Sequence, residues 1–199
     1  MHATPTLAAT APLIPELELR RREYEAAADQ ARELVEGLSD AQLNWRPAPG
    51  AWSIAECLDH LRATADEILS ELDPAMERAR ARGRTGSPPF RYGWLGSWFV
   101  RSIGPRTERS RKIPAPRIYR PVSEHAGDRV LPAFLELQER LVGRLERANG
   151  LDLGIRVRSP VTPLLRIALG QWFEAIAGHQ VRHLQQARAV REHPAFPRG

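Results

Sequence analysis

The stretch GHQVRHLQQA, residues 178–187, decides the fold and the chemistry expected of this sequence. It places His179 and His183 four residues apart within a helical pattern of apolar residues, and side chains at this spacing project from one helix face about one turn apart. Imidazole is the commonest neutral ligand for Zn, Ni, Cu and Fe(II), so the pair is suited to hold one metal ion together with a third ligand. The same spacing also fits a solvated helix face, or two histidines that are satisfied separately in the core.

Other segments upstream carry apolar residues at the same helical spacing. We expect helices at residues 15–38, 53–82 and 128–148, and a last helix that begins between residues 163 and 170 and ends near 192. Ser53 and Glu56 form a capping-box pattern, Asn149-Gly150 is a stop signal, and Pro74 is expected to kink or break the second helix. No convincing strand appears, so the sequence predicts an all-α four-helix bundle.

The connection at residues 83–127 is long and irregular, whereas the other connections are short. A short amphipathic helix fits the spacing of Trp94, Leu95, Trp98, Phe99 and Ile103. We favour a connection that folds over the bundle with these aromatic residues as its own small core. Loops of this length are often functional, so two alternatives stay open: a lid over a pocket, or an anion-binding arm. The basic residues of such an arm would be Arg101, Arg106, Arg109, Arg111 and Lys112.

The 199 residues suit one domain with a substantial core, which we place at residues 15–199 after a flexible leader at 1–14. The net charge of +5 comes from arginines scattered through every expected helix, which disfavours a nucleic-acid partner. Cys57 is the only cysteine, which excludes an internal disulfide and a multi-thiolate zinc site and indicates a reducing compartment. No signal peptide is apparent, and no apolar run reaches the roughly 18 to 20 residues of a membrane span. We therefore expect a soluble, cytoplasmic protein without a membrane partner.

His60 lies on the inward face of the second expected helix, where a histidine taken alone usually hydrogen-bonds a neighbour and binds nothing. Before that helix, Trp45 and Trp52 stand in a loop rich in proline, and we expect both to be buried against the end of the bundle.

Two segments taken together, WSIAECLDHL at 52–61 and HQVRHLQQ at 179–186, resemble the DinB-like four-helix-bundle superfamily. The resemblance covers roughly residues 15–192. It is supported by Arg46-Pro47, Gly50, the Lys112-Ile113-Pro114 connection with Pro121, Arg182 and Gln186. In that family one histidine of the second helix and two of the last form a site for a divalent metal ion. The resemblance therefore implies that His60, His179 and His183 are metal ligands, with zinc or nickel as the expected ion.

Three neutral histidines leave such an ion with its full charge and an open position, which is typical of catalytic sites. A bound water or thiol then has a lowered pKa, so the expected catalytic group is this water or thiol. Relatives include S-transferases that use bacillithiol, mycothiol or glutathione, and a mycothiol-dependent maleylpyruvate isomerase. The resemblance implies a metal-dependent transferase with a low-molecular-weight thiol as co-substrate and a small electrophile as acceptor. The alternative is a stress-related metal-binding bundle without catalytic activity.

Cys57 departs from the family pattern, which has an ordinary apolar residue at this position. It lies three residues before His60, so a fourth, thiolate ligand is conceivable, but a small apolar filler is the interpretation we prefer. The family also forms homodimers through faces of the bundle. Leu19, Leu137 and Leu153 are the apolar residues we assign to such an interface.

Overall fold

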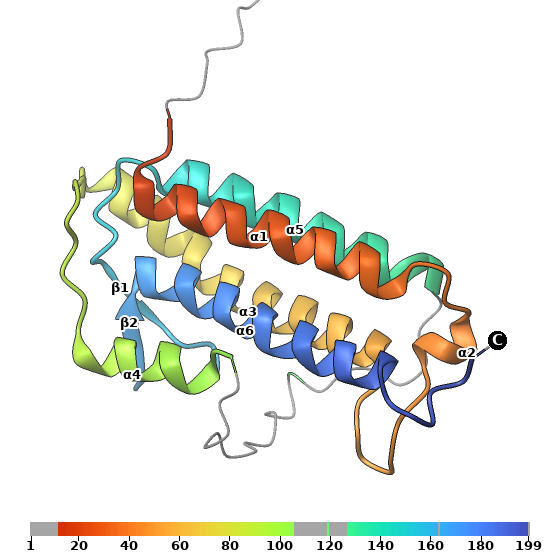
Figure 1. The fold of residues 1–199 in the computed structure, drawn as a ribbon. Coiled ribbons are helices and arrows are strands. Elements are labelled where there is room, and N and C mark those ends of the chain that lie inside the picture. Colours follow the sequence, from red (N-terminus) through yellow and green to blue (C-terminus); the bar gives the residue numbers. More distant parts are fainter. Residues whose placement is uncertain (1–11, 106–118, 120–126, 163, 199) are drawn as a thin grey trace, which may run out of the picture.

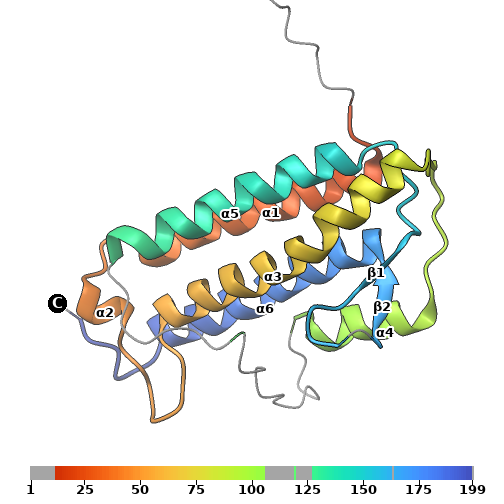
Figure 2. The ribbon, with the colours of Figure 1, turned by 180° about the vertical axis from the view of Figure 1, so that it is seen from behind.

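The apolar stripes of the sequence lie inside a bundle of four long helices (Figures 1 and 2). These helices are α1 (Pro15–Val35), α3 (Ile54–Ala81), α5 (Gly127–Ala148) and α6 (Leu169–Arg191). The structure is a computed structural model, and it describes residues 12–105, 119, 127–162 and 164–198. Most of the expected leader, residues 1–14, lies outside these ranges. The expected all-α four-helix bundle is confirmed.

Each long helix packs mainly on two neighbours, so that α1 and α3 both lie between α5 and α6. Arg191 at the end of α6 donates to the carbonyls of Glu33 and Leu34 at the end of α1, so these two helices run in the same direction. At the opposite end, Asn149 after α5 accepts a hydrogen bond from the N–H of Ile14 before α1. This order makes α3 and α6 direct neighbours although they are far apart in the sequence.

The start of α3 is fixed by the capping box that the sequence predicts. The Ser53 hydroxyl accepts from the N–H of Glu56 at 3.2 Å, and the Glu56 carboxylate accepts from the N–H of Ser53 at 2.9 Å. Arg46 forms a two-pronged ion pair with the same carboxylate at 2.7 and 2.8 Å. Ser53 and Glu56 are buried, so the first turn of α3 and the position of His60 are well determined.

Two helix boundaries differ from the sequence-based expectation. The first helix ends at Val35 rather than Leu38, because Gly37 adopts the left-handed conformation with φ = 73°. The helix α3 does not break at Pro74 but continues to Ala81. Proline removes one hydrogen bond, but Leu72 and Met76 on either side are fully buried in the core, and this packing holds the helix together.

The expectation of no strand is wrong. Strands β1 (Arg156–Arg158) and β2 (Arg166–Ala168) form an antiparallel pair in which Val157 faces Ile167. Both central residues are buried, and Trp172 of α6 donates its indole N–H to the carbonyl of Val157 at 3.2 Å. Three-residue strands are too short to leave an alternating pattern in the sequence, which is why they were not predicted.

The connection between α3 and α5 contains the short helix α4 (Trp94–Ile103), as its spacing predicts, and α4 packs on α6 (Figure 1). Its aromatic residues do not form a separate small core. Phe99 contacts Trp172 of α6 with ring centroids 5.5 Å apart, so the described part of the connection joins the main core. Arg106, Arg109, Arg111 and Lys112 of the proposed anion-binding arm lie outside the described residues, as does the Pro114 to Pro121 connection except for Tyr119.

The two tryptophans of the loop before α3 have different surroundings. The loop follows the short helix α2 (Asp40–Leu43), and Trp45 packs at the end of the bundle against His193 and Phe196, with ring centroids 5.5 Å apart in each case. Trp52 instead reaches the histidines of the bundle interior. The expectation for both residues is therefore correct for Trp45 only.

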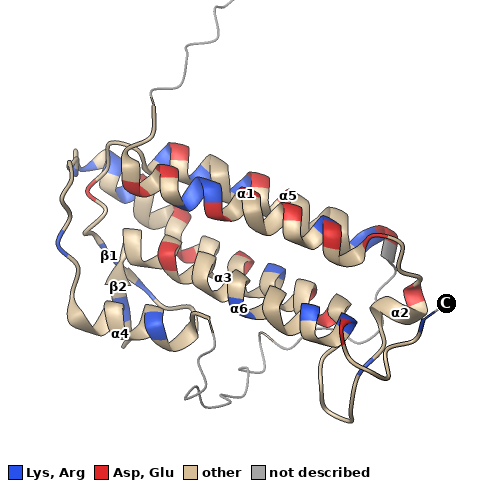
Figure 3. Ribbon diagram, viewed as in Figure 1, with Lys and Arg blue, Asp and Glu red and all other residues tan. Residues whose placement is uncertain are grey.

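The outer surface mixes both signs of charge, and Figure 3 shows acidic and basic residues interspersed along α1 and α5. Ion pairs such as Arg144–Asp73 and Arg140–Asp66 join α5 to α3. In the described ranges we find no helix with the length and apolar character needed to cross a membrane.

Two of the three residues assigned to a dimer interface are unsuitable for that role. Leu137 and Leu153 are both fully buried in the core of the single chain, where they complete its packing, and only Leu19 is exposed. Large exposed apolar side chains occur instead on and beside α4. They are Trp94, Trp98, Val161 and Leu164.

We predict a homodimer that uses this surface, because exposed apolar side chains this large gain most from burial against a second copy. Light scattering at micromolar concentration should give about twice the 22.4 kDa of one chain. Trp94→Ser should shift the mass toward one chain, whereas Leu19→Ser, an exposed position on α1, should not. A single-chain mass for the unaltered protein would rule the dimer out.

Candidate metal centre

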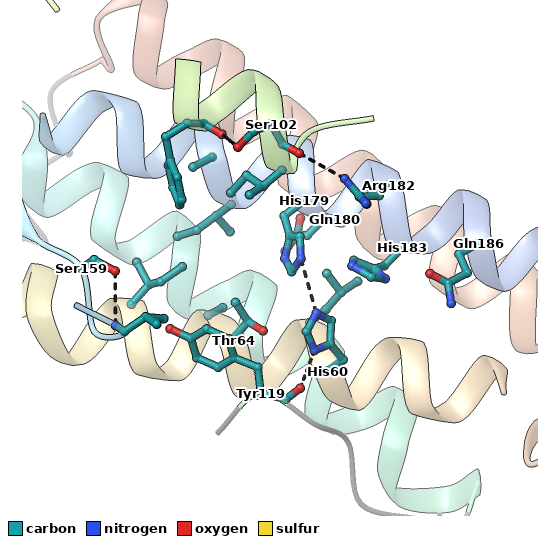
Figure 4. Close-up of a pocket in the computed structure, with 18 of the residues that line it drawn as sticks. His60, Thr64, Ser102, Tyr119, Ser159, His179, Gln180, Arg182, His183 and Gln186 are labelled. Carbon is teal, nitrogen blue, oxygen red and sulfur yellow. Dashed lines mark hydrogen bonds between the residues drawn. The ribbon is translucent and has the colours of Figure 1, made fainter. Parts of the chain in front are cut away.

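Three histidines from two helices meet in the interior of the bundle. His60 comes from α3, and His179 and His183 come from α6 (Figure 4). Their ring centroids are 4.5 to 5.1 Å apart, and one ring nitrogen of each lies within 4.8 Å of the other two. The structure thus brings together all three residues that the family resemblance implies as ligands.

The orientation of the His60 ring is set by a backbone carbonyl. Nδ1 of His60 lies 2.5 Å from the carbonyl oxygen of Tyr119, and because a carbonyl only accepts, Nδ1 carries the proton. Nε2 of the neutral ring then holds a free electron pair, and it points at Nε2 of His179 at 3.3 Å. A metal-ligating histidine typically has such a hydrogen bond at its other nitrogen, so this donor set fits a divalent ion.

Trp52 covers two of the imidazoles. Its ring centroid lies 4.6 Å from that of His60 and 5.6 Å from that of His183, and it stacks on His183 with the planes 28° apart. Trp52 directly precedes the capping residue Ser53, so the fixed start of α3 also positions this indole. The contact limits the movement of both rings and keeps water from one side of the cluster.

The surroundings favour the uncharged form of the imidazoles. Burial lowers the pKa of His60, although the Tyr119 carbonyl and Asp59 act in the opposite direction. The pKa of His179 is lowered further, first by desolvation and then by repulsion from His183, His60 and Arg182. Both rings are therefore neutral at pH 7, which is the protonation state that binds metal.

A cavity of about 970 Å³ opens beside the histidines. Its wall is mainly apolar and comes from α3, α4, α6 and the segment between the strands, and Figure 4 shows the polar groups that interrupt it. Arg182 lines the cavity and donates to the carbonyl of Ser102 on α4 at 3.2 Å, which ties α4 to α6. Arg101, the one described residue of the alternative anion-binding arm, is exposed and does not line the cavity.

Cys57 is not a member of the histidine cluster. Of the described histidine, cysteine and acidic residues, only His60, His179 and His183 form a group that could hold an ion. Cys57 is fully buried, and burial raises the pKa of its thiol, so it stays protonated at neutral pH. These observations agree with the preferred interpretation as an apolar filler.

Sequence reasoning missed several residues at this site. The sequence indicates only packing at the bundle end for Trp52, and it identifies Arg182 only as part of the family motif. Thr64 lies four residues after His60, and Gln180 lies three residues before His183, so helical periodicity from the histidines is the available signal for both. No sequence signal points to the Tyr119 carbonyl, because backbone groups are the same in every residue.

Known proteins resemble this chain along most of its length. Residues 23–187 match the family model of the DinB superfamily. YuaE of Bacillus subtilis (strain 168), an uncharacterized protein, is 27% identical over 162 residues, which are 79% of this chain and 88% of YuaE. The solved structure of YfiT from Bacillus subtilis is similar in fold, with a TM-score of 0.52 and 14% identity over 98% of this chain and 95% of YfiT. YfiT is described as a probable metal-dependent hydrolase with an unusual four-helix bundle topology.

Acidification below pH 6.5 is expected to destabilise the metal-free protein. Burial holds the pKa of folded His60 below its usual value of 6.5, so the unfolded chain binds this proton first as the pH falls, and the free energy of unfolding decreases. The loss is at most about 1.4 kcal/mol per pH unit for one fully shifted imidazole. His179 is partly exposed, so solvent screens its interactions, and its lowered pKa adds less to the pH dependence of the free energy of unfolding.

Urea unfolding in the presence of a chelator, about one pH unit above and below 6.5, measures this difference. The variant His60→Gln lacks the titrating group and should show a flatter dependence on pH. If the free energy of unfolding depends equally on pH in both proteins, His60 is not the group responsible.

Proposed function

This chain belongs to the DinB superfamily, and we propose that it is a metal-dependent enzyme in which His60, His179 and His183 bind one divalent ion, zinc or nickel. The observation that carries the proposal is the grouping of three imidazoles whose ring nitrogens lie within 4.8 Å of one another, with the electron pair of His60 Nε2 directed toward Nε2 of His179. Buried polar nitrogens are costly unless each has a partner, and one ion is a partner for all three.

The cavity beside the cluster supports catalysis over mere metal storage. A closed structural site has four protein ligands, whereas here three neutral ligands border a space large enough for a small molecule. An ion held in this way supplies positive charge that lowers the pKa of a water or thiol bound to it.

The residues of the chain have distinct roles in this proposal. Tyr119 holds His60 in the tautomer that presents Nε2, and Trp52 keeps water from one side of the rings. Arg182 adds a positive charge at the cavity wall, which favours an anionic ligand such as a carboxylate. The carboxylate of Glu56 also lines the cavity, but its ion pair with Arg46 offsets its charge.

The reaction we propose is transfer of a low-molecular-weight thiol to an electrophile. The thiol loses its proton to solvent, its sulfur forms a bond to the electrophilic carbon, and the leaving group departs with the bonding electrons. Arg182 is suited to orient a carboxylate of the thiol. Hydrolysis is the second candidate, because YfiT shares the fold and carries that description, and water would then take the place of the thiol.

Replacing a ligand should remove the metal. The variant His60→Ala, purified without a histidine tag, should retain well under half of the metal that elemental analysis finds in the unaltered protein, because two imidazoles bind far more weakly than three. His193→Ala is the matched control, since His193 packs on Trp45 away from the cluster. Full stoichiometry in His60→Ala, His179→Ala and His183→Ala alike would exclude this site.

Turnover distinguishes the candidate reactions. Metal-loaded protein should conjugate a chloronitrobenzene with bacillithiol, mycothiol or glutathione, lose this activity with chelator, and lose it in His60→Ala. Arg182→Gln should mainly raise KM for the thiol, because it removes an orienting charge rather than a ligand. Cleavage of a nitrophenyl ester without any thiol would favour the hydrolase. If metal is bound but neither reaction occurs and no thiol binds by calorimetry, the non-catalytic alternative replaces both.

A further inference from the structure

Two buried polar atoms of the cavity wall have no hydrogen-bond partner among the described residues. They are Oγ1 of Thr64 and Oε1 of Gln180. Thr64 is 8% exposed and Gln180 is 1% exposed. Buried polar groups of native proteins are almost always hydrogen-bonded, and leaving one unpaired is destabilising. Two such atoms at one cavity therefore indicate a ligand that completes their bonding.

The orientation of the Gln180 amide follows from a chain of contacts across the bundle. Gln138 of α5 places its NH₂ group 3.5 Å from the carbonyl of Phe134, which can only accept. Its amide oxygen therefore faces Gln180 and accepts from the NH₂ of Gln180 at 3.1 Å. The remaining atom of this amide, Oε1, is a fixed acceptor, so its missing partner must be a hydrogen-bond donor.

Thr64 offers a second polar contact on the opposite wall. It lies one helical turn after His60 on α3, whereas Gln180 adjoins His179 on α6, so the two residues come from different helices of the cavity wall (Figure 4). A hydroxyl can donate or accept, so Thr64 tolerates either kind of partner.

The rest of the wall determines the body of the ligand. Flat aromatic rings of Phe99 and Trp172 and aliphatic side chains of Leu61, Ile68 and Ile176 line the cavity. Trp98 and Val161 also line it and are exposed, so they mark its rim. Such a wall favours a largely apolar molecule with a ring that stacks on aromatic faces.

We propose that the cavity takes a largely apolar, ring-containing molecule with a hydroxyl or N–H donor, which Gln180 Oε1 accepts while Thr64 makes a second hydrogen bond. This inference rests on the proposed function in naming the acceptor substrate of that site. The contacts it invokes belong to Thr64 and Gln180, however, and can be tested with and without metal.

Indole and benzothiophene are suitable probes because they have nearly the same shape, but only indole carries a donor. Calorimetry in chelator and with metal gives the ratio of their affinities. In Gln138→Leu/Gln180→Leu, which removes both amides and leaves neither unpaired, the ratio of indole to benzothiophene affinity should fall about five- to tenfold, the usual worth of one hydrogen bond. Gln185→Leu, an exposed glutamine of the same helix, should leave the ratio unchanged.

Thr64→Val provides a second measurement that does not depend on the double variant folding. It removes the unpaired hydroxyl at constant shape, so the ligand-free protein should melt roughly 2–4 °C higher. Indole has one N–H, which Gln180 accepts, so the ratio of indole to benzothiophene affinity should stay unchanged in this variant. Failure of indole to bind, a ratio unchanged in Gln138→Leu/Gln180→Leu, or an unchanged melting temperature in Thr64→Val would overturn the inference. An unchanged ratio would mean that water satisfies these atoms. If the unaltered protein binds no metal but the affinity ratio still falls in the double variant, only the metal proposal is contradicted.

Discussion

The capped first turn of α3 is the constraint on which the site depends. Ser53 and Glu56 satisfy each other's free N–H groups, and Arg46 holds the carboxylate from outside. A helix fixed at its first residue has a fixed rotation, so His60, seven residues on, faces α6 rather than solvent. The same turn positions Trp52 against the imidazole of His60. One local motif thus sets both a candidate ligand and the side chain that shields it.

Stability and function are carried by different parts of the bundle. The contacts between α1 and α5 bury apolar residues, and their exposed faces carry ion pairs along the helix, such as Arg21–Glu25. Several unfavourable groups lie around one cavity where α3 meets α6, namely neutral buried imidazoles and the unpaired atoms of Thr64 and Gln180. A sequence selected only for stability would fill this space with aliphatic side chains. The arrangement is understandable if ligands complete it.

Much of the fold could be predicted because its signals are local. Apolar stripes and caps identify four helices, and the stop at Gly150 is correct. The site could not be predicted from local signals alone. Sequence spacing pairs His179 with His183, but no local pattern connects them to His60, and only the family resemblance indicates that the three lie together. The wrong predictions also concern features that local signals do not determine. Packing around Leu72 and Met76 keeps α3 continuous through Pro74, and strands of three residues are too short to show an alternating pattern. Which arginine lines the cavity also depends on tertiary structure.

The contact between His60 and Tyr119 has a consequence for how the protein can change during evolution. The group that orients the imidazole is a main-chain carbonyl, so any residue type at position 119 can provide it. Substitutions there would alter the cavity wall, which the tyrosine ring lines, without altering the tautomer of His60. An insertion or deletion nearby would move the carbonyl itself. We therefore expect the residue type at this position to vary among relatives, whereas the length of the segment that places the carbonyl should be kept.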